Sequence, residues 1–94
     1  PDLRVVGVGA TGAPAGYHTW VRREVVSCDR VETFAEGVAT RQPASLTSAI
    51  LWRDLDDFRL VDDAAMPRAI LTLLETTRML AEGAGAAPLA AAHA

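Results

Sequence analysis

The sequence contains no lysine, since all nine of its basic residues are arginine. Chemistry that needs an amine side chain as the nucleophile therefore cannot come from this chain alone. Cysteine occurs once, at Cys28, which excludes an internal disulfide and fits a reducing cytoplasm. We interpret this lone thiol as a small strand or loop residue and not as a nucleophile. No apolar run approaches the ~20 residues that a membrane-spanning helix needs, so no membrane association is expected.

An excess of positive charge is also absent. The net charge of -3 gives no reason to expect a nucleic acid or an anionic membrane as partner. What the chain does have is apolar residues, which make up 50% of its 94 residues, and this composition is typical of a globular protein. At this length we expect at most one small domain. The chain starts at Pro1 without a methionine, which suggests a fragment or a processed product.

The apolar pattern predicts strands that alternate with helices. Short strands are expected at residues 3–8, 24–28 and 58–61, and the first is apolar on both faces, as in a buried parallel strand. Helices are expected at residues 15–21, 45–55, 66–80 and in the alanine-rich segment at the end. This order indicates an α/β fold with a mostly parallel sheet and flanking helices. Because three short strands cannot complete such a sheet, the chain is expected to be part of a larger domain.

The ends and faces of two helices are predicted in more detail. Ser45 or Thr47 is expected to cap the helix over residues 45–55, and Asp62 and Asp63 are expected to cap the next helix. Pro67 is expected to distort the first turn of that helix. Its apolar stripe is interpreted as core packing against a sheet, and consists of Met66, Ile70, Leu73, Thr77 and Leu80.

Three glycines near the start have the spacing of a dinucleotide-binding loop. Gly7, Gly9 and Gly12 spell G-x-G-x-x-G after a predicted strand, and Asp29 follows at roughly the distance of a ribose-binding acid. Against this interpretation, the helix that follows is short and is crowded by bulky side chains. The motif alone leaves a Rossmann-like fragment as one possibility.

Other chemistry-bearing residues do not form a recognisable site. His18 and His93 have no Cys, His or paired carboxylate partner at metal-ligand spacing, so we interpret them as a surface helix residue and a terminal residue. Three aspartates crowd together before a predicted strand and are interpreted as a solvated turn: Asp54, Asp56 and Asp57.

Two segments of small residues are more specific. "LAEGAGAAPLAAA" (residues 80–92) places a carboxylate before a helix with almost no side chains, so a flat ligand can approach its backbone closely. "VETFAEGVATRQP" (residues 31–43) is a second small-residue loop around Gly37. Together with "LDDFRLVDD" (residues 55–63) and the Gly-Ala-Pro-Ala turn at residues 12–15, these segments resemble the pyridoxal-phosphate-dependent threonine/serine dehydratases, relatives of serine racemase and the tryptophan synthase β chain.

The resemblance implies a fold-type II domain whose cofactor, pyridoxal phosphate, is bound by a lysine and by a glycine-rich phosphate loop. It implies dehydration and deamination of a small β-hydroxy amino acid to a 2-oxo acid and ammonia. This chain would be the later portion of the catalytic domain (residues 1–94). It would lack the lysine and the phosphate loop, so it would contain no catalytic residue. Two cofactor contacts would remain: Gly37, with its backbone beside the ring, and Glu82, with its carboxylate near the ring.

The resemblance also bears on metals and on the glycine motif. Some family members bind Mg²⁺ or Ca²⁺ through two acidic side chains and a backbone carbonyl. The corresponding positions here are Gly9, Ala15 and the carbonyl of Ala13, so we expect no cation. Because family members commonly have glutamate at the position of Gly9, the G-x-G-x-x-G spacing is interpreted as accidental.

The parent enzyme is expected to be a cytoplasmic homo-oligomer. The chain by itself is expected to be inactive and to self-associate through its open strands. The alternative from another class is a small non-enzymatic α/β module that binds a partner chain through its incomplete sheet. A Rossmann-like dinucleotide-binding fragment is the weaker alternative.

Overall fold

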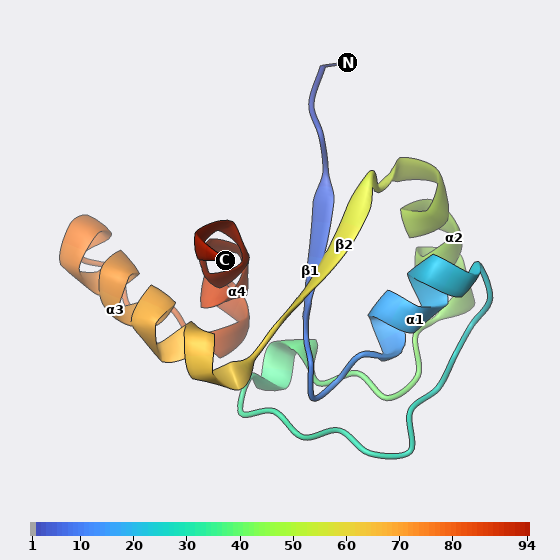
Figure 1. Cartoon of the computed structure of the whole chain (residues 1–94), viewed down its shortest axis with the longest axis horizontal. Coiled ribbons are helices and arrows are strands. Elements are labelled where there is room, and N and C mark those ends of the chain that lie inside the picture. Colours follow the sequence, from blue (N-terminus) through green and yellow to red (C-terminus); the bar gives the residue numbers. More distant parts are fainter. Residues whose placement is uncertain (1) are drawn as a thin grey trace.

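The computed structural model describes residues 2–94, which fold around a two-stranded parallel sheet. The strands are β1 (Val6–Ala10) and β2 (Asp57–Val61), and their register pairs Val6 with Asp57 and Ala10 with Val61. The helices are α1 (Ala15–Arg22), α2 (Ser45–Asp54), α3 (Met66–Thr77) and α4 (Gly83–His93), with short 3-10 turns η1 (Glu36–Val38) and η2 (Asp63–Ala65). Figure 1 shows α1 and α2 on one side of the strands and α3 and α4 on the other. The predicted α/β class with parallel strands and flanking helices is confirmed.

The first strand begins later than the apolar pattern predicts. Leu3 is 81% exposed and lies outside β1. The backbone before β1 is nevertheless fixed, because Val5 donates its amide to Asp56 Oδ2 at 2.7 Å and accepts from the Asp56 amide at 2.9 Å. The apolar run therefore extends beyond the residues that pair with β2.

The strand predicted at residues 24–28 is wrong. These residues have no regular secondary structure. Their backbone groups form hydrogen bonds outside any sheet. The amide of Val26 donates to Thr19 Oγ1 at 2.9 Å, and the carbonyl of Val26 accepts from the same hydroxyl at 3.2 Å. The amide of Cys28 donates to the carbonyl of Arg41 at 2.8 Å. Contacts with α1 and with a distant loop thus replace a sheet ladder.

The predicted caps of α2 and α3 are also wrong, although both helices form. The N-cap of α2 is Ala44, and Thr47 Oγ1 donates to the Ala44 carbonyl and so caps no amide. The turn η2 precedes α3, whose N-cap is Ala65 without a side-chain hydrogen bond. Asp62 and Asp63 accept from threonine hydroxyls in other loops. Pro67 lies in the first turn of α3, where its missing N–H leaves no bond unmade.

The hydrophobic core lies between α3, α4 and the strands. Met66 is fully buried, and most of the other buried members of its core cluster are alanines: Ala10, Ala13, Ala35, Ala69, Ala86, Ala87 and Ala90. Ile70 and Leu73 pack inward as predicted, but the main packing partner of α3 is α4, which lies next to the strands, and not the sheet that the sequence predicts. Thr77 is exposed, and Leu80 is 78% exposed because α3 ends at Thr77 with Arg78 in the left-handed conformation. The stripe is therefore confirmed for its first three members only.

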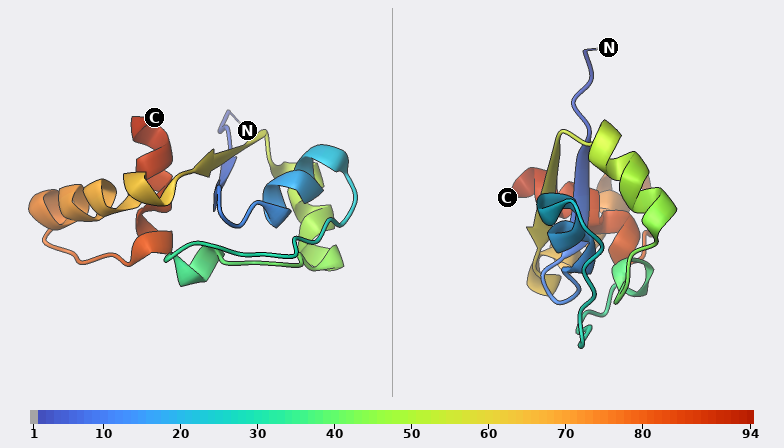
Figure 2. Two further views of the ribbon diagram at one scale, coloured as in Figure 1. Left: turned by 60° about the horizontal axis from the view of Figure 1, so that its bottom comes forward. Right: turned by 90° about the vertical axis from the view of Figure 1, so that its right-hand side faces the viewer.

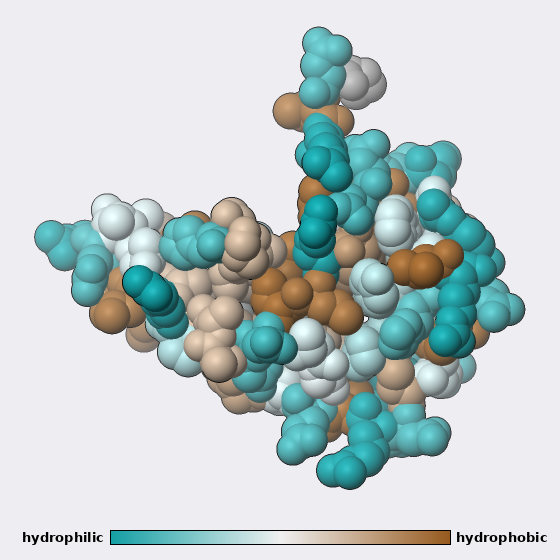
Figure 3. All heavy atoms as spheres, viewed as in Figure 1, coloured by the Kyte–Doolittle hydropathy of each residue, from teal (hydrophilic) through white to brown (hydrophobic). Residues whose placement is uncertain are grey.

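The sheet is incompletely covered. Helices lie on both sides of the strands (Figure 2), but the sheet face beside α4 is only partly covered. A groove of about 560 Å³ runs there, lined by Val6, Val8, Arg59, Leu60, Val61, Pro88, Ala91, Ala92 and Ala94. Apolar residues gather in the middle of the molecule in the space-filling view (Figure 3). In residues 2–94 no helix is long and apolar enough to cross a membrane.

Candidate functional site

The structure brings the two predicted site residues together. A Cβ placed on Gly37 would lie 3.9 Å from each carboxylate oxygen of Glu82 and 2.7 Å from the Cβ of Ala84. Gly37 is in η1 and Glu82 directly precedes α4, and these segments lie side by side in both orientations (Figures 1 and 2). Residues far apart in the sequence thus form one small surface, which we call the η1–α4 surface: residues 33–38 and 82–85.

Glu82 is the N-cap of α4. Its Oε1 accepts from the amide of Gly85 at 2.7 Å, and its Oε2 accepts from the amide of Ala84 at 3.2 Å. The carboxylate therefore satisfies two of the free amides of the helix, and its negative charge lies at the positive end of the helix dipole. Because each oxygen accepts one bond here, each keeps acceptor capacity for a further donor. The residue remains exposed.

Small residues allow the close approach of η1 to α4. A Cβ on Gly83 would lie 2.9 Å from the ring of Phe34 and 3.0 Å from the Cβ of Ala35. Ala35 itself is fully buried. Larger side chains at Gly83 or Gly37 would push the loop away from the helix, so the glycine-alanine composition determines how closely Gly37 approaches Glu82.

The loop that carries Gly37 is bound to Asp63. The carboxylate of Asp63 accepts from Thr33 Oγ1 and, at 2.9 Å, from the amide of Phe34. Thr33 Oγ1 in turn accepts from the amide of Ala35 at 3.1 Å. Sequence reasoning missed both residues because it assigned Asp63 to a helix cap. A pair of acids directly after a strand, together with a threonine at the start of the small-residue loop, is the sequence feature that could have indicated this contact.

An open groove adjoins Gly37. It has a volume of about 460 Å³, and its lining includes Gly9, Gly16, Tyr17, Gly37, Val38, Gln42, Leu51 and Phe58. Its walls are largely apolar with aromatic rings, since Tyr17 and Phe58 meet edge to face at 6.0 Å between ring centroids. A flat ligand is compatible with such walls.

The glycines of the G-x-G-x-x-G spacing are packed against protein atoms. A Cβ on Gly12 would overlap the carbonyl oxygen of Glu32, and one on Gly7 would lie 2.9 Å from Leu55 and Phe58 side chains. The side chain of Arg41 donates to the carbonyl oxygen of Asp29 at 3.0 Å. Other parts of the chain therefore occupy the space beside these glycines, and this packing does not favour a dinucleotide-binding loop.

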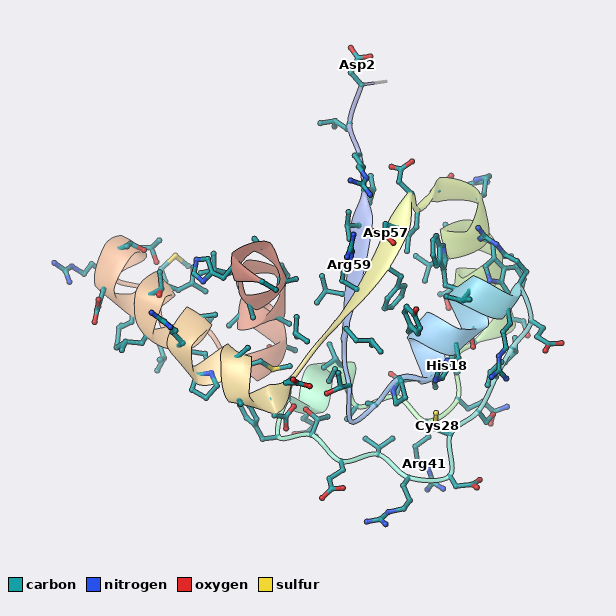
Figure 4. All side chains as sticks on the ribbon, in the orientation of Figure 1. Asp2, His18, Cys28, Arg41, Asp57 and Arg59 are labelled. Carbon is teal, nitrogen blue, oxygen red and sulfur yellow. The ribbon has the colours of Figure 1, made fainter. Side chains whose placement is uncertain are left out.

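The acidic turn before β2 is more ordered than a solvated cluster. Asp57 accepts from the amide of Phe58 and from Arg59, each at 2.8 Å, and from Arg4 at 3.4 Å (Figure 4). The Phe58 amide, with smaller contributions from Arg59 and Arg4 against the cost of burial, lowers the pKa of the Asp57 carboxyl. The hydrogen bond from Arg53 similarly lowers the pKa of Asp54. Asp57 thus helps to order the start of β2, whereas Asp54 pairs with its neighbour at the end of α2.

The two histidines lie on different helices and outside the η1–α4 surface. His18 is on α1 with its ring 5.5 Å from that of Tyr17, and His93 is exposed in the last turn of α4. Ala13, in the turn after β1, and Ala15, the first residue of α1, are buried. Among residues 2–94, no group of three or more His, Cys, Asp or Glu side chains is arranged to hold a metal ion. That the chain binds no cation stays a prediction.

Comparison with known proteins gives concordant matches over the whole chain. A family described as "Pyridoxal-phosphate dependent enzyme" matches residues 1–94. The chain is 36% identical over 91 residues to the L-threonine ammonia-lyase of Geobacter sulfurreducens, which covers 97% of this chain and 23% of that relative. It thus spans about a quarter of that relative's length.

Solved structures agree. The structure of maize serine racemase superposes with a TM-score of 0.93 and 26% identity, covering 100% of this chain and 29% of that one. A threonine deaminase from T.th. superposes with a TM-score of 0.90 and 27% identity, covering 96% of this chain and 32% of that one. The arrangement of strands and helices described above therefore matches about a third of the length of each of these solved chains.

Proposed function

This chain belongs to the family of pyridoxal-phosphate dependent enzymes, and from that premise we propose that it is a segment of the catalytic domain of a threonine or serine ammonia-lyase. The parent enzyme would convert a small β-hydroxy amino acid to a 2-oxo acid and ammonia. We further propose that it is a cytoplasmic homo-oligomer. The observation that carries the proposal is the meeting of Gly37 with Glu82 at the start of α4, on a chain that matches a threonine ammonia-lyase over 97% of its residues.

The residues present fit one side of a pyridoxal-phosphate site. Gly37 is exposed and lines a largely apolar groove that a flat ring could enter, while its lack of a Cβ lets α4 approach closely. The carboxylate of Glu82 is fixed by two amides and keeps acceptor capacity toward a ligand or its hydrogen-bond network. When bound, the cofactor supplies the electron sink for the reaction. The Gly37 backbone would position the ring, and Glu82 would orient hydrogen-bond donors beside it.

The start of α4 is a poor phosphate site. Helix N-termini bind phosphate through free amides and the helix dipole, but here Glu82 already accepts from the amides of Ala84 and Gly85. Its negative charge would also repel a phosphate. The phosphate anchor, like the amine, would therefore come from a part of the parent enzyme outside residues 1–94. This agrees with the lack of lysine in the chain.

The alternative of a non-enzymatic partner-binding module has weaker support. It rests on the incomplete sheet alone, and the proposed place of the chain within a larger enzyme domain would also account for that sheet. The Rossmann-like alternative is disfavoured by the packing of Gly7 and Gly12 against protein atoms.

The test uses the full-length parent enzyme with the Glu82→Gln substitution. We expect a large decrease in the rate of 2-oxo acid formation from threonine or serine, together with a changed absorption band of the bound cofactor, while the circular dichroism spectrum is unchanged. The matched control is Glu75→Gln, because Glu75 is exposed on α3 and should leave rate and spectrum unaltered. A Glu82→Gln enzyme with the parent's rate and spectrum would remove Glu82 from the site. A parent enzyme that forms no 2-oxo acid from either amino acid would refute the activity.

A further inference from the structure

Two adjacent aspartates follow β2, and each accepts a threonine hydroxyl from a different loop. Asp62 Oδ1 accepts from Thr11 Oγ1 at 2.7 Å, and Asp63 accepts from Thr33 Oγ1. The two pairs have the same chemistry and neighbouring positions. They differ in what they connect, because Thr11 belongs to the turn between β1 and α1, whereas Thr33 begins the loop that carries Gly37.

The pair of Asp63 and Thr33 forms a compact network that fixes three consecutive residues. Asp63 accepts from the Thr33 hydroxyl and the Phe34 amide, and Thr33 Oγ1 accepts from the Ala35 amide. A carboxylate that accepts from both a side chain and a backbone amide restrains position and orientation together. The residues that follow are then packed, because Ala35 is fully buried and the Phe34 ring borders Gly83.

This network connects the sheet to the η1–α4 surface. Asp63 comes two residues after Val61, which ends β2 and whose carbonyl accepts from the amide of Thr11 at 3.0 Å. The position of Asp63 is thus set by the paired strands. From there the loop runs through Ala35 to Gly37, which lies against Ala84 and Glu82. No other side chain in residues 2–94 accepts hydrogen bonds from residues 33–35 except that of Thr33 itself.

We infer that Asp63 and Thr33 are positioning residues for the cofactor: their hydrogen bonds hold the loop of residues 33–38 so that the Gly37 backbone faces the Glu82 carboxylate. Neither residue touches the cofactor. They act through Gly37, and the inference rests on the proposed function. Their loss should weaken cofactor binding and change the environment of the ring, beyond any general loss of stability.

The experiment uses the full-length parent enzyme, freed of cofactor and titrated with pyridoxal phosphate while absorbance is followed. Thr33→Val removes the hydroxyl at nearly constant volume, so Asp63 loses one donor and the Ala35 amide loses its acceptor. We expect about 10-fold weaker cofactor binding, the size of one lost hydrogen bond to a charged group. A shifted absorption band of the bound cofactor is expected as well. Hydrogen exchange at the amides of residues 34–39 should become faster in the cofactor-free enzyme.

Two further variants separate positioning from stability. Thr33→Ser keeps the hydroxyl and should restore cofactor affinity to within about 2-fold of the parent enzyme. Thr11→Val breaks the neighbouring pair with Asp62, which is a single exposed bond, and should lower the melting temperature by no more than Thr33→Val does, with cofactor affinity and spectrum unchanged. If Thr33→Val binds the cofactor as the parent does, or if Thr11→Val weakens binding equally, the inference is wrong. A parent enzyme that takes up no pyridoxal phosphate would overturn the proposed function itself, which is a distinguishable result.

Discussion

Gly12 and Glu32 are in direct backbone contact. The amide of Glu32 donates to the carbonyl oxygen of Gly12 at 2.8 Å, and a Cβ on Gly12 would overlap the carbonyl oxygen of Glu32. The turn after β1 is thereby joined to the start of the loop that leads to Gly37. The close approach that a glycine permits is used here between two parts of the chain, and a phosphate group is not needed to explain it.

Gly12→Ala is therefore expected to destabilise the full-length enzyme. The overlap is with backbone, which cannot move aside as a side-chain end does, so we expect a loss of about 1–3 kcal/mol or more. The measurement is the thermal unfolding of the cofactor-free enzyme. Gly85→Ala is the matched control, since a Cβ there meets neighbours at 3.5 and 3.6 Å, which is ordinary contact. Equal melting temperatures for the two variants would contradict the packing described for Gly12.

Gly37→Ala should disturb the η1–α4 surface, and a second substitution should repair it. The new Cβ would lie 2.7 Å from the Cβ of Ala84, so the loop has to move away from Glu82. We expect weaker binding of pyridoxal phosphate by the full-length enzyme, measured by absorbance titration. Ala84→Gly removes the clashing atom and should restore much of the affinity in the double variant. If the effects of Gly37→Ala and Ala84→Gly on cofactor affinity were simply additive in the double variant, the two residues would not be in contact.

The sequence predicts well what depends on local pattern. β2, α2 and α3 lie close to their predicted positions because their apolar residues recur with the period of the element that forms. Met66, Ile70 and Leu73 pack inward for the same reason. The segments around Gly37 and Glu82 were identified by their small residues, and the structure places them together.

What the sequence does not predict depends on distant partners. Residues 24–28 have the composition of a strand, but Thr19 and Arg41 take their backbone hydrogen bonds. Asp63 has the position of a helix cap, but Thr33 and Phe34 donate to its carboxylate. In each case a residue outside the segment, as in the bond from Val26 to Thr19, competes successfully with the local preference, and no periodicity reveals that competitor.

Met66→Ala should be among the more damaging core substitutions. Met66 is the largest fully buried side chain, and it lies in a core cluster made mostly of alanines, whose short side chains cannot fill the space it leaves. We expect a loss of about 2–5 kcal/mol in the free energy of unfolding. Leu71→Ala on the same helix is the control, because Leu71 is 53% exposed and should cost far less. The free energies of unfolding of the full-length enzyme and of both variants are compared by chemical denaturation.

The acidic turn before β2 should make stability depend on pH. The pKa of Asp57 is lowered in the folded state, chiefly by the Phe58 amide and then by Arg59 and Arg4. A lowered pKa means that the ionised carboxylate stabilises the fold above the unfolded pKa of about 4, and that this stabilisation is lost as the pH falls through the lower folded value. Asp57→Asn should therefore reduce the melting temperature at pH 7 and have a smaller effect below about pH 4. A difference that stays constant between these pH values would contradict the assignment.

The isolated 94-residue chain should bind no cofactor covalently and show no ammonia-lyase activity. It has no lysine, so pyridoxal phosphate has no side-chain amine with which to react. The chain ought also to self-associate, because its strands have open edges and apolar residues in and before β1 are exposed, among them Val5 at 49% and Val6 at 40%.

Titration with pyridoxal phosphate, followed by absorbance and light scattering, tests both expectations. A variant that supplies a lysine within the chain, such as Gly9→Lys, is not a suitable positive control, because the new side chain would lie against Phe58 and Leu60. The full-length parent enzyme is the better one, since it should give the absorbance change and a defined particle size under the same conditions. Addition of the missing portion of the catalytic domain should restore a site only where the two pieces complete one sheet, with the groove along Val6, Val8 and Leu60 covered. A monodisperse monomer that binds the cofactor tightly would show that residues 1–94 form a self-sufficient unit, contrary to the segment proposed here.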